Sequence, residues 1–310
     1  MPLLYTDPSF LDHDTGEHRE CADRLRSVGE MLKKSDVASK FKPGEIKAAT
    51  LAQLGRVHSP QHIANVEKFA EKGGGRIESD TVVSPKSYQV ALKAAGTAAA
   101  AVDAVIKGEH RRAMCLIRPP GHHAVPAKAQ GFCLFNNVAV AAAQAQWIHQ
   151  ATRILVVDFD VHHGNGTQDI FYDSENVYFL SSHRHPFYPG TGTEDETGTG
   201  RGLGTIFNLP LTFGTSRKEI LSRFETLLND AAKRCKPEIV LLSAGFDAHK
   251  EDPIGSLELE TEDFTKLTKQ VVAVADEYCD GQLVSLLEGG YNVKSLAESV
   301  ECHLWVLADK

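Results

Sequence analysis

The stretch RILVVDFDVHHGNGTQDIFY, residues 153–172, combines the pattern of a buried strand with a dense group of side chains that can bind metals. The apolar run 154–157 is typical of a strand that is buried on both faces, as in parallel sheets. Asp160 and His162 follow at once, and on an extended chain they point to the same side while Val161 points away. Ligands of open α/β sheets bind just beyond the carboxyl ends of such strands. The stretch therefore predicts an α/β fold with a site at this strand end.

An ordinary structural role is also open to these side chains, because Asp and His near strand ends often cap loops. The full motif D-x-D-x-H-H-G-N-G, residues 158–166, is considerably more specific than a single Asp-x-His pair. Gly164 and Gly166 permit a tight turn into a short helix, which we predict at residues 167–172. As a whole, the motif favours a metal site over a set of loop caps.

The composition is that of a globular chain and limits its partners. With 310 residues, 42% of them hydrophobic, the chain is compatible with one large α/β domain or two smaller ones. Its net charge of −8 argues against nucleic acid or an acidic membrane as partner, because both require a basic surface. The six cysteines form no C-x-x-C pair, which is typical of a reducing compartment. The N-terminus has no basic, apolar leader and no apolar run reaches 18 residues, so we expect a cytoplasmic protein.

Strand and helix patterns alternate along the rest of the chain. Strands are predicted at residues 3–5, 113–117, 177–181, 205–209, 239–242 and 283–287, and helices at 20–33, 60–72, 85–107, 137–149, 217–236, 261–279 and 293–310. We find no internal repeat and no linker. This alternation predicts a single domain, residues 1–310, with a mainly parallel sheet flanked by helices on both faces.

Polar side chains also follow three further predicted strands. The loop RPPGHH, residues 118–123, is made rigid by two prolines and carries His122 and His123, which are hard to explain by packing. Asp247 lies in the loop SAGFDAHKEDP and Tyr291 in the loop EGGYN. Because the carboxyl ends of parallel strands share one edge of a sheet, we expect all of these side chains to meet the Asp and His of the first motif.

The chemistry of this set is that of amide hydrolysis. Two carboxylates and an imidazole, from Asp160, Asp247 and His162, suit a borderline cation such as zinc, with open positions for water and a substrate carbonyl. Such a metal lowers the pKa of its water and polarises the carbonyl. The two adjacent histidines can transfer protons, and Tyr291 can donate a hydrogen bond to a tetrahedral oxyanion.

A hydrolase with two metals would need further bridging carboxylates. Two residues beyond His162 and Asp247, the chain has Gly164 and His249 instead. We therefore expect one catalytic metal.

The segments RPPGHHA, GFCLFNN, DFDVHHGNGTQDIFY, FYPGTG, SAGFDAHKEDPIG and LEGGYN resemble those of the zinc-dependent histone deacetylase family, in its bacterial class II-like branch. The resemblance covers nearly the whole chain. It implies the arginase-deacetylase α/β fold, with zinc, or ferrous iron in vivo, on Asp160, His162 and Asp247. It also implies that a hydroxamate inhibitor would bind at the metal.

The same resemblance implies a role for each of the other candidate residues. His123 would be the general base and acid, oriented by Asn165, and His122 with Asp158 an electrostatic partner. Tyr291 would stabilise the oxyanion. The acyl-lysine tunnel and the acetate exit would be formed by Phe132, Tyr188, Ile254, Gly131, Gly289, Gly290 and, at the exit, Arg24, which without the resemblance reads as a surface charge. Two structural potassium ions would use Asp158, Asp160, His162, Ser181 and Ser182 for one, and Phe171, Ser174 and Val177 for the other.

Several substrates fit this site. The main expectation is an acetylated lysine in a protein or peptide; an acetylated small amine is the alternative, because acetylpolyamine amidohydrolases are related enzymes with an acidic gate. Ile254 is apolar at the gate position, which argues against polyamines, whereas Glu78 and Asp80 could supply negative charge at the mouth. A catalytically silent binding module is a further alternative that the retained site residues disfavour, and the choice between monomer and homo-oligomer is open.

Overall fold

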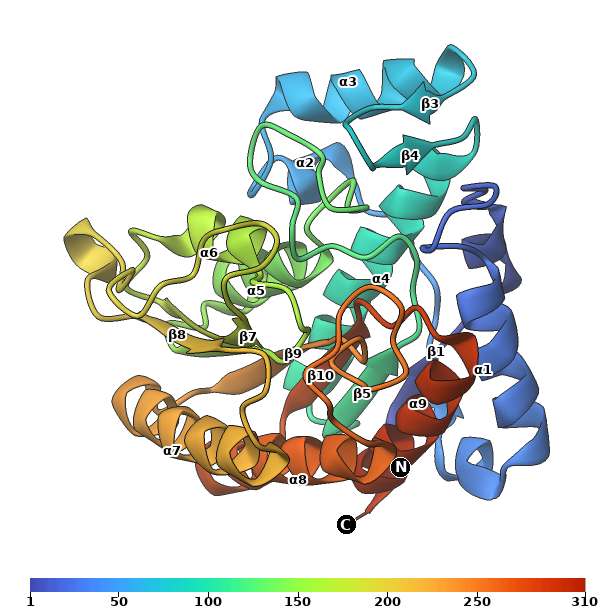
Figure 1. The fold of residues 1–310 in the computed structure, drawn as a ribbon. Coiled ribbons are helices and arrows are strands. Elements are labelled where there is room, and N and C mark those ends of the chain that lie inside the picture. The colour runs from blue at the N-terminus through green and yellow to red at the C-terminus, as the bar shows by residue number, and fades with distance from the viewer. Residues whose placement is uncertain (310) are drawn as a thin grey trace.

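The computed structural model describes residues 1–309 and contains a parallel eight-stranded sheet at its centre (Figure 1). The strands are β1 Leu3–Tyr5, β2 Lys42–Pro43, β5 Arg112–Cys115, β6 Ile154–Asp158, β7 Val177–Arg184, β8 Ile206–Leu211, β9 Ile239–Ala244 and β10 Leu283–Leu287. Their order in the sheet is β2-β1-β5-β10-β9-β6-β7-β8, and every neighbouring pair is parallel. The predicted parallel α/β sheet is thus confirmed.

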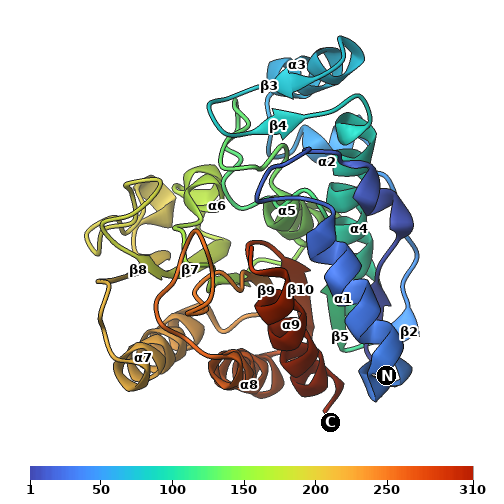
Figure 2. The same ribbon diagram turned by 45° about the vertical axis from the view of Figure 1, so that its right-hand side comes forward.

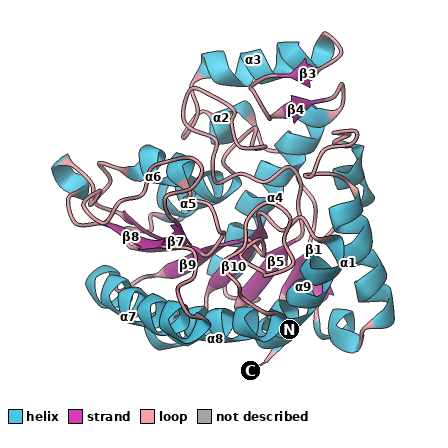
Figure 3. Ribbon diagram, in the orientation of Figure 1, coloured by secondary structure: helices cyan, strands magenta, loops and turns pink. Residues whose placement is uncertain are grey.

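Helices cover both faces of this sheet (Figures 1, 2 and 3). They are α1 Asp23–Lys34, α2 Leu51–Leu54, α3 Pro60–Glu71, α4 Ser87–Ile106, α5 Asn137–His149, α6 Asn165–Phe171, α7 Arg217–Cys235, α8 Thr261–Tyr278 and α9 Val293–Ala308. Helices α4 and α5 pack on one face, and α1, α7, α8 and α9 pack on the other. Helix α4 is long and apolar enough to cross a membrane, but 67% of its most apolar window is buried in this core.

Strand β6 illustrates why the sheet is buried on both sides. Ile154 and Val156 join the hydrophobic core beneath α4 and α5, whereas Leu155 and Val157 join the core beneath α7, α8 and α9. All four side chains are completely buried. Because successive residues of a strand point to opposite faces, a continuous apolar run is what a strand between two helical layers requires.

Several local predictions differ from the structure in detail. The helix expected from Pro85 begins at Ser87 as α4, because the Ser84 carbonyl and amide are already engaged in a turn with Ser87. Strand β7 continues three residues beyond the predicted end, to Arg184. The short strand β2 and the antiparallel hairpin of β3 Gly75–Arg76 and β4 Val82–Val83 were not predicted, because two residues are too few to show a periodicity.

The four strands that precede the candidate loops are adjacent in the sheet, in the order β5-β10-β9-β6. Their registers pair Val157 of β6 with Leu242 of β9, which in turn faces Ser285 of β10. All of these strands run in the same direction, so their following loops open at one edge. The fold thereby brings together residues that are more than 160 positions apart in the chain, such as His122 and Glu288.

Candidate active site

Asp160, His162 and Asp247 form a buried cluster at the ends of β6 and β9, and their ligand atoms all lie within 4.8 Å of one another. His162 Nδ1 is 2.9 Å from Asp160 Oδ1 and 3.1 Å from Asp247 Oδ2. Asp247 Oδ2 is buried without a hydrogen-bond donor among the described residues, since His162 meets it only as an ion pair. The three predicted ligands are therefore assembled around one point.

The electrostatics of this cluster fit a divalent cation. Burial would lower the pKa of His162, but the adjacent carboxylates of Asp160 and Asp247 raise this pKa to about 10. Burial, followed by the charge of Asp160, also raises the pKa of Asp247 to about 7. The two converging carboxylates therefore favour a positive charge between them, and without a metal this charge is the proton on His162. A metal bound by these two carboxylates and one imidazole would replace that proton. Zinc accepts both kinds of ligand, and catalytic zinc sites use three protein ligands.

Backbone groups fix the orientation of both carboxylates. Asp160 Oδ2 accepts from the Gly289 amide at 2.8 Å, and Asp247 Oδ1 accepts from the Val161 amide at 2.9 Å. A side chain at Gly289 would collide with the facing oxygens of Asp160 and Asp247, and one at Gly245 would collide with Asp160. These two glycines are therefore required by the close approach of the backbone to the cluster.

His122 and His123 lie beside the cluster, with their ring centroids 4.0 Å apart. His122 Nδ1 lies 2.8 Å from Asp158 Oδ2, and His123 Nδ1 lies 2.7 Å from Asn165 Oδ1. These are the two pairings that the family resemblance implied; the catalytic roles of the residues stay predictions. Gly131 packs against the His123 ring so closely that any larger residue there would collide with it.

The two imidazoles have opposite protonation preferences. Burial would lower the pKa of His122, but the charges of Asp158 and Asp160 outweigh it and raise this pKa to about 10. Burial and the neighbouring rings of His122 and His162 instead hold the pKa of His123 well below its ordinary value. His123 is therefore the neutral member of the pair at pH 7, and His122 is the cationic one.

Glu288 supports the loop that carries both histidines, and we did not predict it. Its carboxylate is completely buried, and Oε2 accepts from the amides of Gly121 at 2.6 Å and His122 at 3.2 Å. Oε1 accepts from the Ser243 hydroxyl at 3.1 Å. The available signal was a charged residue at the end of the mostly apolar run LVSLLE, residues 283–288.

Tyr291 lies next to Arg24, whose guanidinium is 5.1 Å from the centre of the phenol ring. The default expectation of a surface charge at Arg24 is wrong, because this side chain is completely buried. It donates to the carbonyls of Gly290, at 2.7 Å, and Glu288, and pairs with Glu20 at 3.1 Å. Burial and the charge of Asp247 raise the pKa of Tyr291 well above its usual value, so its hydroxyl remains a donor.

Aromatic rings surround the approach to the cluster. The ring of Phe132 is 5.7 Å from that of Tyr291, and the ring of Tyr188 is 5.1 Å from that of His123. Tyr188 is 40% exposed, so it lies at the mouth, and Ile254 is half-buried on a neighbouring loop. Phe187, which we did not predict, stacks on His162.

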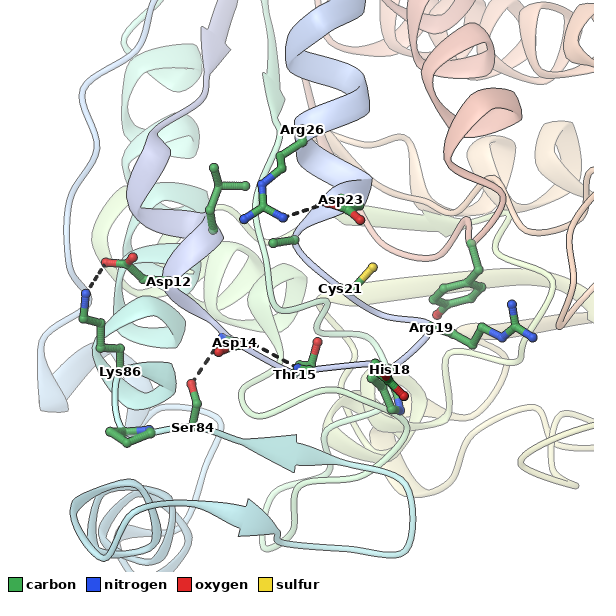
Figure 4. Close-up of a pocket in the computed structure, with 16 residues that line it drawn as sticks. Asp12, Asp14, Thr15, His18, Arg19, Cys21, Asp23, Arg26, Ser84 and Lys86 are labelled. Atoms are coloured by element: carbon green, nitrogen blue, oxygen red, sulfur yellow. Dashed lines mark hydrogen bonds and ion pairs between the residues drawn. The ribbon is translucent and has the colours of Figure 1, made fainter.

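An open pocket of about 930 Å³ lies beside Tyr291, between the segment 11–26 and residues 84–86 (Figure 4). Its charged residues partly neutralise one another, through the pairs Asp12 with Lys86 and Asp23 with Arg26.

The residues expected at the potassium sites fall into two separate groups. Asp158 and Ser181 are register partners in β6 and β7, with Ser182 next in the strand, close to the metal cluster. Phe171, Ser174 and Val177 lie together after α6, where the Ser174 amide donates to the Phe171 carbonyl and the Ser174 hydroxyl accepts from the Val177 amide. Val177 precedes Ser181 by four strand residues, so the groups are about 13 Å apart along β7.

The chain belongs to the histone deacetylase family. Residues 18–307 match the histone deacetylase domain. The sequence is 39% identical to histone deacetylase 14, chloroplastic, of Arabidopsis thaliana, over 96% of this chain and 74% of that protein. It is 35% identical to the histone deacetylase-like amidohydrolase of Pseudomonas aeruginosa, over 89% of this chain and 73% of that protein.

Structural comparison gives the same family. The crystal structure of the HDA15 HD domain superimposes with a TM-score of 0.93 at 34% identity, covering 99% of this chain and 91% of that one. The expected family and the arginase-deacetylase fold are thus confirmed. The chain is a hydrolase that acts on amides, of a metal-dependent family, and its buried Asp-His-Asp cluster can hold a metal.

Proposed function

We propose that the chain is a zinc-dependent deacetylase that hydrolyses the amide of N-acetyl-lysine, or a related acyl-lysine, in proteins or peptides. The observation that carries this proposal is the convergence of Asp160, His162 and Asp247 with a neutral His123 at one sheet edge. Zinc, or ferrous iron in vivo, would be held by those three ligands, where it would activate a water molecule and polarise the amide carbonyl.

His123 is proposed as the general base and then the general acid. Asn165 Oδ1 accepts from the Nδ1–H of His123 at 2.7 Å, so the lone pair of this neutral ring is on Nε2. Because the pKa of His123 is held low by burial, the ring is free to take a proton from water and later to give it to the amine product.

His122 and Tyr291 are proposed to stabilise charge in the transition state. The Asp158 carboxylate keeps His122 protonated, which places a fixed positive charge next to His123. Because the pKa of Tyr291 is raised well above its usual value, its hydroxyl keeps its proton and can donate to the oxyanion that forms from the carbonyl oxygen.

The walls of the approach suit the aliphatic chain of lysine. We propose that Phe132 and Tyr188, with Ile254, Gly131, Gly289 and Gly290, form the acyl-lysine tunnel, and that Arg24 lines the exit of the acetate product. Aromatic side chains offer large apolar surfaces, which favour the methylene groups of lysine over water.

An acetylated small amine such as an acetylpolyamine is the second candidate substrate. The Phe132 amide donates to Thr81 Oγ1 at 3.1 Å, which places the acidic turn with Glu78 and Asp80 beside a tunnel residue. The charges of Asp80 and Glu78 also contribute, after burial, to the raised pKa of Tyr188 at the mouth. An acidic mouth of this kind would attract a cationic amine chain.

Steady-state hydrolysis distinguishes these substrates. The zinc-loaded protein would be assayed with an acetyl-lysine peptide, N-acetylputrescine and acetylspermidine, each with and without a hydroxamate chelator. A peptide preference that the chelator abolishes is expected. A polyamine preference that the E78Q/D80N variant removes would support the second candidate, and no turnover of any substrate would leave only a silent acyl-lysine-binding module.

We further propose that residues 1–310 act as one catalytic domain in the cytoplasm, with potassium ions at the two groups of residues described above. Acetylated proteins, peptides or small amines are the proposed partners, and nucleic acid and membranes are not. The homo-oligomer considered from the sequence would be tested by light scattering.

A further inference from the structure

The segment Glu288–Gly289–Gly290–Tyr291 runs past the metal cluster, and its backbone is held from both sides. Arg24 donates to the carbonyls of Glu288 and Gly290. The Gly289 amide donates to Asp160, and the Gly289 carbonyl accepts from the Phe246 amide at 3.1 Å. The Glu288 amide donates to the Ala244 carbonyl at 3.0 Å, and the Tyr291 amide donates to Asp252 Oδ2 at 2.7 Å. Each of these backbone groups thus has its own partner, as a segment close to a buried site requires.

Asp252 uses both oxygens of its carboxylate. While Oδ2 accepts from the Tyr291 amide, Oδ1 accepts from the amides of Ile254 and Gly255, each at 2.9 Å. Oδ1 therefore stabilises the turn that contains Ile254, a proposed tunnel residue, and Oδ2 holds the backbone of Tyr291. The side chain of Asp252 thus connects Ile254 with Tyr291.

The turn that contains Asp252 is itself fastened to the metal cluster. The Ser256 amide donates to the carbonyl of Asp247 at 2.7 Å, and Gly255 fits against the same backbone so closely that a side chain there would collide with it. These contacts fix the position of Asp252 relative to Asp247, a proposed metal ligand. Through its hydrogen bond to the Tyr291 amide, Asp252 in turn fixes the loop that follows β10.

We propose that Asp252 is a positioning residue that sets the place of Tyr291 relative to the metal ligands. Gly289 and Gly290 precede Tyr291, and Gly290 has a φ of +120°, so the segment would otherwise have wide conformational freedom. The inference rests on the proposed role of Tyr291 as the oxyanion donor and adds the group that holds it in place.

A carboxylate is required because both oxygens accept. An Asn at this position would have one oxygen and one NH₂ group, and the NH₂ group cannot accept from an amide. The variant D252N therefore keeps the size of the side chain but loses either the Ile254 turn or the Tyr291 bond, and either loss breaks the link between that turn and Tyr291.

The test is a double-mutant cycle with D252N and Y291F, measured on the zinc-loaded full chain with the acetyl-lysine peptide. We expect D252N to lower kcat on the order of 10- to 100-fold with KM little changed, because a small misplacement of a catalytic group has an effect of this size. In the Y291F background, D252N should change kcat less than about twofold, since the group that it positions is already absent.

Hydrogen exchange provides a readout that is independent of turnover. Peptides that cover residues 288–292 should exchange faster in D252N than in the wild type, while the metal content stays the same. K250M is the matched control in the same loop, because the Lys250 ammonium is 2.7 Å from the Glu260 carboxylate and makes no described contact with Asp252 or Tyr291. Its exchange at 288–292 and its kcat should equal those of the wild type.

Three results would overturn the inference. Equal losses of kcat from D252N in both backgrounds would indicate a general structural effect. If D252N has the wild-type kcat and Y291F is inactive, the positioning role of Asp252 is rejected and the role of Tyr291 is kept. Wild-type kcat in Y291F would reject both this inference and the proposed role of Tyr291, and it is thereby distinguishable from the other two.

Discussion

The ring of Phe187 stacks on the ring of His162, with centroids 5.2 Å apart and planes inclined by 18°. The guanidinium of Arg184 lies 4.4 Å from the centre of the Phe187 ring and 4.7 Å from that of Phe213. Arg184 also donates to the Gly255 carbonyl at 3.0 Å. A layered stack of three aromatic rings and one cation therefore leads from a proposed metal ligand to the surface.

Removing the Phe187 ring should weaken metal binding. In F187A the His162 imidazole loses the surface that fixes its orientation, and loss of support around a ligand typically lowers metal affinity about 10-fold or more. Zinc affinity measured by competition with a chromogenic chelator checks this. F213A is the matched control, because Phe213 is 57% exposed and contacts Arg184 rather than His162. Equal affinities in F187A and the wild type would contradict the expected role.

Replacing Asp247 by Asn should empty the metal site. The substitution keeps the shape of the side chain but removes one of two ligand charges, and metal binding depends on deprotonated ligands. Metal analysis of purified D247N should find little zinc, whereas D230N, a change in the surface pair of Asp230 with Arg234, should retain it. Full zinc occupancy in D247N would count against the ligand set.

Truncating Glu288 should destabilise the protein strongly. In E288A the buried amides of Gly121 and His122 lose their acceptor, and an unsatisfied buried donor costs about 1–3 kcal/mol. We therefore expect the free energy of unfolding in urea to fall by about 2–6 kcal/mol. S243A, which removes only the Oε1 contact, is the comparison and should lose about 1 kcal/mol. Similar losses of unfolding free energy in E288A and S243A would contradict the proposal that Glu288 acts mainly as the acceptor for the amides of Gly121 and His122.

Acid should destabilise the fold through buried neutral histidines such as His303. The Thr268 hydroxyl donates to the Phe264 carbonyl at 2.6 Å and accepts from His303 Nδ1 at 2.7 Å, so Nε2 is left to accept from Ser285 at 2.9 Å. Protonation at Nε2 would remove the acceptor of the Ser285 hydroxyl proton and place a charge in a completely buried site. Burial lowers the pKa of His303 to about 3.

The sign of the effect follows from that pKa. Between about pH 6.5, the ordinary histidine value, and pH 3, the unfolded chain binds a proton at His303 that the folded chain does not. Stability is therefore complete above pH 6.5 and falls below it by about 1.4 kcal/mol per pH unit for each such histidine. The free energy of unfolding, measured in urea at pH 7, 6 and 5, should fall less steeply with decreasing pH in H303N than in the wild type. If the unfolding free energy falls with pH equally in H303N and the wild type, His303 does not contribute to acid destabilisation.

The sequence was sufficient to predict what depends on local patterns. The apolar run before Asp158 identified β6, and the parallel sheet followed from the alternation of strands and helices. The convergence of Asp160, His162 and Asp247 then followed from the shared edge of such a sheet. The family resemblance also implied catalytic roles, such as that of His123. The structure shows the contacts of these residues, and their roles stay predictions until activity is measured.

The supporting residues could not be predicted in this way, because their partners are distant in the chain. Arg24 is buried by contacts with Gly290, 266 residues away, and Glu288 contacts Gly121, 167 residues away. A charged residue in a loop has no local feature that separates burial from exposure. The contact of Phe187 with His162 was likewise not predictable from the sequence, because it depends on the path of the loop after β7.

Strand β10, the last strand along the described residues, lies in the middle of the sheet, between β5 and β9. Until residues 283–287 are available, the two parts of the sheet have no hydrogen-bonded ladder between them, and Tyr291 and Glu288 are missing from the site. Closing such a long-range contact is slow, because the entropy of a large loop is lost before the strand gains its neighbours. A chain that stalls before β10 would therefore lack the centre of its sheet rather than one edge, although β6 and β9, which carry the three proposed metal ligands, pair directly with each other.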